Sequence, residues 1–109
     1  MESLNREKVP SFISALYGTI NKQKKTQILT DDDYYKQVEK ALISSFEEKL
    51  TPREKKIALM RYGLEDGRSR SVEQVGQAFG ITKERMRCYE AKIFRKLRHP
   101  LVKDKIKVK

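Results

Sequence analysis

The stretch ITKERMRCYEAKIFRKLRHP, residues 81–100, combines cationic groups with regularly spaced apolar residues. At about 100° per residue, the apolar residues fall on one side of a helix: Met86, Tyr89, Ile93 and Leu97, with Phe94 at the margin. The opposite side carries Glu84, Arg87, Cys88, Ala91, Arg95 and Arg98. Small residues within a basic face let a helix lie deep in the major groove while longer side chains reach bases and phosphates. The pattern therefore favours a DNA-reading helix over a solvated surface helix, which would more often mix charge signs.

The positive charge of the chain is concentrated in its second half. Residues 1–50 hold eight Lys or Arg and eight Asp or Glu, whereas residues 51–109 hold seventeen against seven, which accounts for the whole net charge of +10. A one-sided basic field suits a polyanion, and nucleic acid is a better match than an anionic membrane. A general bias toward solubility is the alternative explanation.

Length and composition exclude several classes of protein. The 109 residues leave room for one domain. No stretch approaches the roughly 20 apolar residues of a membrane span, and the first residues lack the pattern of a signal peptide. The single cysteine, Cys88, excludes an internal disulfide and predicts a reduced, cytosolic chain.

The sequence shows no constellation for catalysis or for a cofactor. It contains no Ser/His/Asp set, no phosphate-cradling glycine loop and no paired carboxylates, so we expect neither an enzyme nor a cofactor. His99 is the only histidine and has no cysteine partners, which argues against a metal site. Cys88 could be a redox-active thiol because Arg85, Arg87 and Lys92 lie nearby. A small neutral residue on a groove-facing surface is the favoured interpretation.

The elements that would position the basic helix are predicted to be all α. We expect about four helices, with a possible short extra helix from Pro10, and a linker after Gly18. The next helix is predicted to be capped by Thr30 and to carry carboxylates in its first turn. Its buried stripe comprises Tyr34 or Tyr35, Val38, Ala41, Leu42, Ser45 and Phe46.

The second of these four helices has complete start and stop signals. Thr51 is the predicted cap, Pro52 occupies the first helical position, and Glu54 completes a capping box. Gly63 ends the helix. Its buried side is predicted to comprise Ile57, Ala58, Met60 and Tyr62.

The last two helices have the spacing of a helix-turn-helix. Ser71 and Thr82 are the predicted caps of the two helices. Gly76 allows a close approach between them, and Gly80 can take the positive φ of the turn. Two packed helices without a ligand are the alternative.

At this point the residues match a known family. LTPREKKIALMRYGLEDG and SVEQVGQAFGITKERMRCYEAKIFRKLRHP resemble region four of bacterial housekeeping-type sigma factors over about residues 50–100. The resemblance implies a helix-turn-helix domain that binds promoter −35 DNA and the β-subunit flap of RNA polymerase in the bacterial cytoplasm, at the nucleoid. It divides the chain into an N-terminal segment and linker (1–30), the region-four-like domain (31–100) and a basic tail (101–109).

The resemblance also implies roles for individual residues. The positions that face bases are Lys83, Glu84, Arg87 and Cys88. The positions that contact phosphates are Arg53, Arg61, the amide end at Val72 and Glu73, and the basic face of Lys92, Arg95, Lys96 and Arg98. The positions expected to hold the polymerase flap are Ile57, Met60, Tyr62 and Leu64.

Two departures from the family limit what the resemblance implies. Cys88 stands where glutamine is usual and Lys83 where arginine is usual, and both differences argue against recognition of the common −35 sequence, though not against DNA binding. Nothing before residue 30 resembles region two, and we therefore expect a stand-alone region-four-like factor, with a second protein supplying the region-two function of a split sigma factor. The alternatives are a regulator that dimerises through the 34–46 stripe or the N-terminal segment and binds a palindrome, and a flap-binding decoy without a DNA role.

Overall fold

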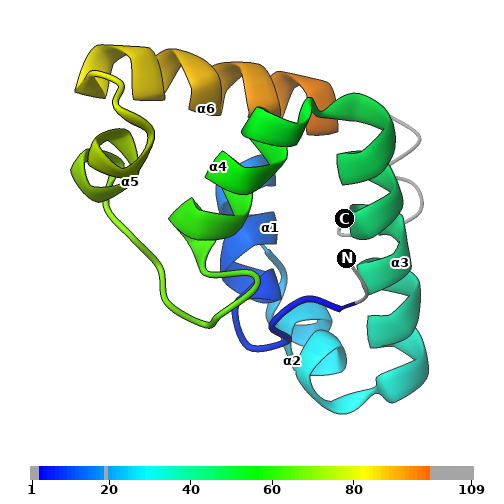
Figure 1. Ribbon diagram of the computed structural model, residues 1–109. Helices are drawn as coiled ribbons and strands as arrows, with labels where there is room; N and C mark the ends of the chain where they lie inside the picture. Colours follow the sequence, from blue (N-terminus) through cyan, green and yellow to red (C-terminus); the bar gives the residue numbers. More distant parts are fainter. Residues whose placement is uncertain (1–2, 19, 99–109) are drawn as a thin grey trace.

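The computed structural model describes residues 3–18 and 20–98, which form six helices and no strand. The helices are α1 (Val9–Tyr17), α2 (Lys22–Thr30), α3 (Asp32–Lys49), α4 (Pro52–Tyr62), α5 (Val72–Phe79) and α6 (Lys83–Leu97) (Figure 1). The predicted all-α fold is confirmed. The predicted basic tail, residues 101–109, and His99 lie outside the described residues.

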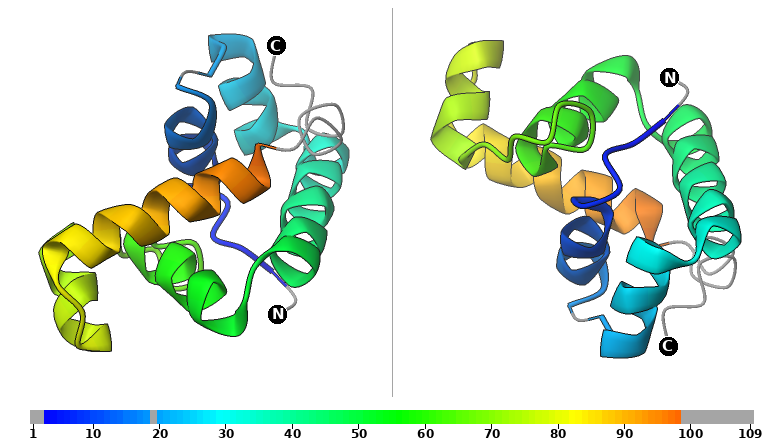
Figure 2. Two further views of the ribbon diagram at one scale, coloured as in Figure 1. Left: turned by 90° about the horizontal axis from the view of Figure 1, so that it is seen from above. Right: turned by 90° about the horizontal axis from the view of Figure 1, so that it is seen from below.

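Helix α6 is the element around which the others are arranged. It contacts α3, α4 and α5. Both views in Figure 2 show α5 at the N-terminal end of α6, with α1, α2 and α3 gathered toward its C-terminal end. Within the described residues, no helix has the length and apolar character needed to cross a bilayer.

The predicted helix caps of the C-terminal half are confirmed by geometry. The Thr51 hydroxyl accepts from the Glu54 N–H at 3.2 Å, and the Glu54 carboxylate accepts from the Thr51 N–H at 2.9 Å. Ser71 and Gln74 form the same reciprocal capping box at α5. The start of each helix is therefore fixed by residues within one turn of it.

The chain after Gly18 differs from its prediction. Instead of a linker, it forms α2, whose first turn is capped by the Asn21 side chain accepting from the Gln23 N–H at 2.7 Å. The helix is largely polar and buries Ile28 completely against the core. Tertiary packing of one side chain, together with the cap, outweighs the absence of an apolar stripe.

The start of α3 also differs from its prediction. Asp31, not Thr30, is the N-cap, and its carboxylate accepts from the Tyr34 N–H at 3.0 Å. Thr30 is instead the last residue of α2, where its hydroxyl donates to the Thr26 carbonyl. The N-cap of α3 lies one residue after the predicted position because α2 continues to Thr30.

One hydrophobic core connects all six helices. The predicted stripe of α3 is buried, with Tyr35 rather than Tyr34 as its first aromatic residue. Phe12 of α1 lies at the centre of an aromatic group, and its ring centroid is 5.8 Å from that of Phe46, 5.2 Å from that of Tyr62 and 6.4 Å from that of Phe94. Helix α1 is therefore packed against the same core as the helix-turn-helix.

Candidate nucleic-acid interface

The turn between α5 and α6 sets the position of the basic helix. Gly76 is buried, and a β-carbon there would lie 2.8 Å from the Ile81 carbonyl oxygen. Gly80 takes φ +67°, and the Ile81 N–H donates to the Gly76 carbonyl at 2.9 Å. Only glycine fits the close contact at position 76, and glycine is favoured at the positive φ of position 80. The two glycines therefore determine how closely α6 approaches α5.

The two sides of α6 are divided as the periodicity predicts. Met86, Ile93 and Leu97 are buried, whereas Tyr89 and Phe94 are half-buried. The outer side is exposed and carries Glu84, Arg87, Cys88, Ala91, Arg95 and Arg98. A continuous exposed surface therefore follows this side of the helix.

Four cations on α6 are exposed and form no ion pair within the described residues. We call them the cationic face: Arg85, Arg87, Lys92 and Arg95. Arg85 was not among the contact residues that the sequence predicted. It lies one turn from Cys88. An open surface hollow of about 250 Å³ is lined by Arg85, Cys88, Tyr89 and Lys92. The i, i+3, i+7 spacing of Arg85, Cys88 and Lys92 in the sequence could have indicated this grouping.

The predicted base-facing residues lie together on the first turns of α6. Lys83, Glu84, Arg87 and Cys88 are all exposed, and Cys88 is a free thiol. The Lys83 Nζ lies 3.0 Å from the Glu73 carboxylate, and the hydrogen bond from Lys83 lowers the pKa of Glu73. This ion pair joins the first turns of α5 and α6, so two predicted DNA contacts, Lys83 and Glu73, are here each other's partners. Val72, the first residue of α5, is half-buried beside them.

Two predicted phosphate contacts on α4 are held by the neighbouring helices. The Arg53 guanidinium lies over the rings of Phe79 (5.8 Å) and Tyr89 (5.9 Å) and remains exposed. Arg61 is half-buried. Its Nε lies 3.1 Å from the Glu90 carboxylate, and its Nη1 donates to the Arg70 carbonyl. Arg53 is therefore exposed beside the cationic face, with one hydrogen bond of 3.2 Å to the Phe79 carbonyl, whereas Arg61 is half-buried and engaged within the protein.

The C-terminal part of the predicted basic face divides into exposed and engaged cations. Lys96 reaches the Glu54 carboxylate at 2.7 Å, and the Glu54 side chain is only 3% exposed. The Arg98 Nε donates to the Leu16 carbonyl at 2.6 Å, and its guanidinium lies over the Phe94 ring. Lys92 and Arg95 thus remain available for an external anion, while Lys96 and Arg98 connect α6 to α4 and α1.

The four residues expected to hold the polymerase flap do not form an open surface in this structure. Ile57 and Leu64 are completely buried, and Met60 and Tyr62 are half-buried. The Tyr62 ring packs against Phe12 of α1, and its hydroxyl lies 3.3 Å from the Glu90 carboxylate. Burial and the nearby Glu90 charge raise the pKa of Tyr62, so its hydroxyl stays protonated.

We expect Lys96 to contribute to stability rather than to DNA binding. Replacing Lys96 with methionine leaves the buried Glu54 carboxylate with only the Thr51 N–H, and should lower the free energy of unfolding by about 1–2 kcal/mol. Lys92→Met is the matched control, because Lys92 is exposed and should change stability by less than about 0.5 kcal/mol. Urea denaturation of the two variants measures the difference, and equal losses would contradict the assignment.

Glu54 should also make stability dependent on pH in the acid range. Burial acts to raise the pKa of Glu54, but the hydrogen bonds from Lys96 and Thr51 and the charges of Lys96 and Lys92 outweigh it and lower the pKa below its usual 4.5. A depressed folded-state pKa adds stability above the unfolded pKa and loses it as pH falls through the folded one. Glu54→Gln should therefore lose less stability than the wild type between about pH 5 and pH 3. Parallel pH profiles from urea titrations would contradict this role.

Comparison with known proteins shows what the C-terminal half of the chain is similar to. The family model described as "Sigma-70, region 4" matches residues 48–99. The RNA polymerase sigma factor SigA of Clostridium acetobutylicum is 55% identical over 58 residues, which cover 53% of this chain and 15% of that protein. SigA of Bacillus sp is 52% identical over 58 residues, with the same coverage of both chains. The chain thus spans about 15% of the length of these relatives. The matched residues contain α4, α5 and α6 with their caps and glycine turn, and they form a sigma-70 region-four-like helix-turn-helix domain.

Proposed function

We propose that this chain is a non-enzymatic, DNA-binding transcription factor that acts on promoter DNA of the −35 type. The observation that carries the proposal is the cationic face, which the α5–α6 turn presents on the exposed side of α6. Unpaired guanidinium and ammonium groups neutralise phosphates and release counterions, which drives binding to duplex DNA. The identities of SigA over the same residues support the choice of promoter DNA as the ligand.

Recognition of bases is assigned to the first turns of α6. The Arg87 guanidinium can donate to guanine or to a phosphate, and the Glu84 carboxylate can accept from a cytosine amino group. Lys83 would have to leave Glu73 to reach DNA, and Cys88 cannot form a bidentate bond to a base. The preferred site should therefore differ from the common −35 sequence at the bases that these two positions face.

Contacts to the DNA backbone are assigned to residues around the cationic face. Arg53 is exposed next to α6, and Val72 and Glu73 lie at the amide end of α5, where helix termini favour phosphates. Glu73 would contribute through its backbone N–H, because its carboxylate is paired with Lys83. Lys92 and Arg95 extend the contact along α6.

A helix-turn-helix of this size needs a tether to act on DNA. A single module buries roughly 600–1,000 Å² on DNA, and its affinity in physiological salt is expected to be about micromolar. Attachment to the β flap of RNA polymerase would raise the local concentration and make weak contacts sufficient. We propose that the chain binds this flap, and that a second protein supplies the region-two function.

A palindrome-binding dimer formed through the 34–46 stripe has no support in the structure. Tyr35, Val38, Leu42 and Phe46 are buried within the chain's own core. Within the described residues, these four side chains are therefore not available to a second copy.

Capture of bacterial RNA polymerase core by the purified chain tests the polymerase role. Intact core enzyme should be captured, and core enzyme that lacks the β flap tip should not be captured. Equal capture of both enzymes, or capture of neither, would overturn the flap assignment. Duplex binding without polymerase would then identify a free-standing DNA-binding regulator.

A further inference from the structure

Helix α1 is a short apolar helix with one face buried in the core, while Ser11 and Ala15 on its other face are exposed. Its nine residues, VPSFISALY, carry no charge, and Val9, Phe12, Ile13 and Leu16 are all 0% exposed. The Phe12 ring contacts the rings of Phe46 on α3, Tyr62 on α4 and Phe94 on α6. Helix α1 therefore fills an apolar surface that these three helices form together, in the manner of a helix bound in a groove.

Helix α1 and the segment before it contact two of the four residues expected to hold the polymerase flap, Tyr62 and Leu64. Tyr62 is in direct ring contact with Phe12. Leu64 is completely buried, and its carbonyl accepts the Asn5 N–H from the segment that leads into α1. An external helix could not occupy the positions of Phe12 against Tyr62 and of Asn5 against Leu64 while the N-terminal segment stays in place.

Helix α1 has little stability of its own. It has no side-chain N-cap, no acidic residue in its first turn and no basic residue in its last turn. An isolated helix of this length is unstable in water, so its order depends on packing against α2 and on the Phe12 contacts with α3, α4 and α6. A competing apolar helix would remove that support.

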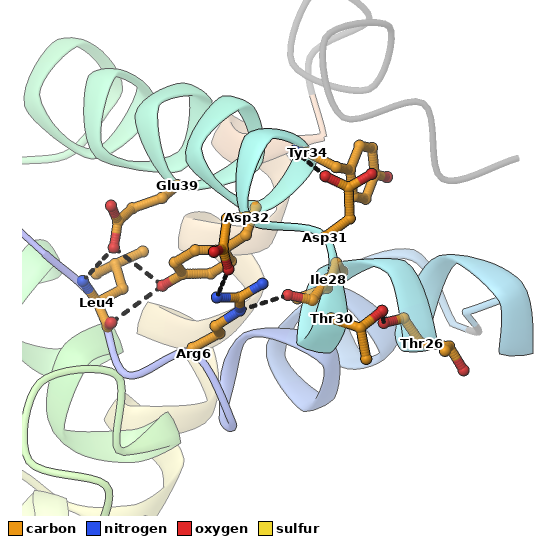
Figure 3. A network of polar contacts seen from close by, with 10 residues as sticks. Leu4, Arg6, Thr26, Ile28, Thr30, Asp31, Asp32, Tyr34 and Glu39 are labelled. Carbon is orange, nitrogen blue, oxygen red and sulfur yellow. Dashed lines mark hydrogen bonds and ion pairs between the residues drawn. The ribbon is translucent and has the colours of Figure 1, made fainter.

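The segment is held at both ends by polar contacts, of which only the ion pair to Asp32 is exposed and the other two are partly buried. In Figure 3, the Arg6 Nε donates to the Ile28 carbonyl at 2.7 Å, and the guanidinium forms an ion pair of 2.6 Å with Asp32. At the other end, the Arg98 Nε donates to the Leu16 carbonyl. The Asp32 side chain is 76% exposed, and exposed ion pairs of this kind contribute little free energy. The ion pair between Arg6 and Asp32 can therefore open at little cost.

We propose that α1 is an intramolecular occupant of the flap-binding surface, and that a polymerase flap helix binds there by displacing α1. The inference rests on the proposed function, because the competing helix is the flap. The chain has then two states, one with α1 in the groove and one with the groove open. The apparent dissociation constant for the flap equals the intrinsic one divided by the fraction of open chains. Weakening α1 must tighten flap binding.

The test measures binding of the isolated β-flap domain to the full chain by isothermal titration calorimetry. Arg6→Gln removes the fastening to Asp32 and Ile28, and should tighten binding about fivefold. Phe12→Leu removes the aromatic contacts while keeping an apolar side chain, and should tighten it about tenfold. Lys8→Gln is the matched control: it removes the same charge from the same segment, but Lys8 forms no ion pair within the described residues, so binding should stay within about twofold. Circular dichroism establishes that each variant is folded.

Hydrogen exchange of the same complexes shows where the flap binds. The amides of residues 9–17 should lose protection when the flap is added, while those of α4 and α6 stay protected. If the flap binds but residues 9–17 stay protected and Arg6→Gln is no tighter than Lys8→Gln, displacement of α1 is wrong and the polymerase role stands. If no form of the chain binds the flap, the polymerase role falls and this inference falls with it.

Discussion

Replacing Gly63 with alanine is expected to lower the free energy of unfolding by about 2–5 kcal/mol. Gly63 ends α4 at φ +62°, a left-handed conformation that costs a residue with a side chain about 1–2 kcal/mol. A β-carbon would also lie 2.6–2.7 Å from backbone atoms of Arg68 and Ser69. Backbone atoms cannot rotate away, so the 63–70 loop that leads to α5 must move.

Gly80→Ala is the control that separates the two causes. Gly80 has nearly the same φ, +67°, but no heavy atom lies within 4 Å of the position of its β-carbon. Its replacement should therefore cost only the conformational term of about 1–2 kcal/mol. Urea denaturation followed by far-UV circular dichroism measures both variants. Equal losses would show that the contact with Arg68 and Ser69 relaxes at no cost.

Reversing two charges of the cationic face is expected to weaken binding to promoter DNA at least about 100-fold. Arg87→Glu with Arg95→Glu removes two exposed, unpaired guanidinium groups and places carboxylates against the phosphates. The slope of log K against log salt should fall by about two, because about two fewer counterions are released. Fluorescence anisotropy with a labelled duplex over a range of salt concentrations measures both quantities.

A matched double reversal elsewhere on the surface distinguishes α6 from net charge. Lys25→Glu with Lys40→Glu makes the same change in charge at exposed positions on α2 and α3. This variant should keep most of the affinity, and an equal loss would mean that DNA is bound through overall charge alone. Flap capture should be unchanged by the α6 reversal. A flap-binding decoy would likewise keep flap capture, but its effect on transcription would not depend on Arg87 or Arg95.

The sequence by itself determined the parts of the fold that depend on local interactions. Thr51 with Glu54, and Ser71 with Gln74, cap their helices through contacts three residues apart, so the residue types alone predicted them. The apolar period likewise predicted which side of α6 is buried. The glycine spacing of the helix-turn-helix belongs to the same class, since a positive φ and a close approach each require one residue type.

Tertiary structure alone decided which cations are available and what covers the core. Lys96 and Lys92 lie on the same basic helix, yet Lys96 is paired with Glu54, 42 residues away, and Arg98 with the Leu16 carbonyl, 82 residues away. Helix α2 forms from a largely polar stretch because Ile28 is buried in the core. The contact of Phe12 with Tyr62 and the hydrogen bond from Asn5 to the Leu64 carbonyl have the same origin. Contacts between residues far apart in the chain depend on how the helices pack, and neither helical period nor residue type encodes that arrangement.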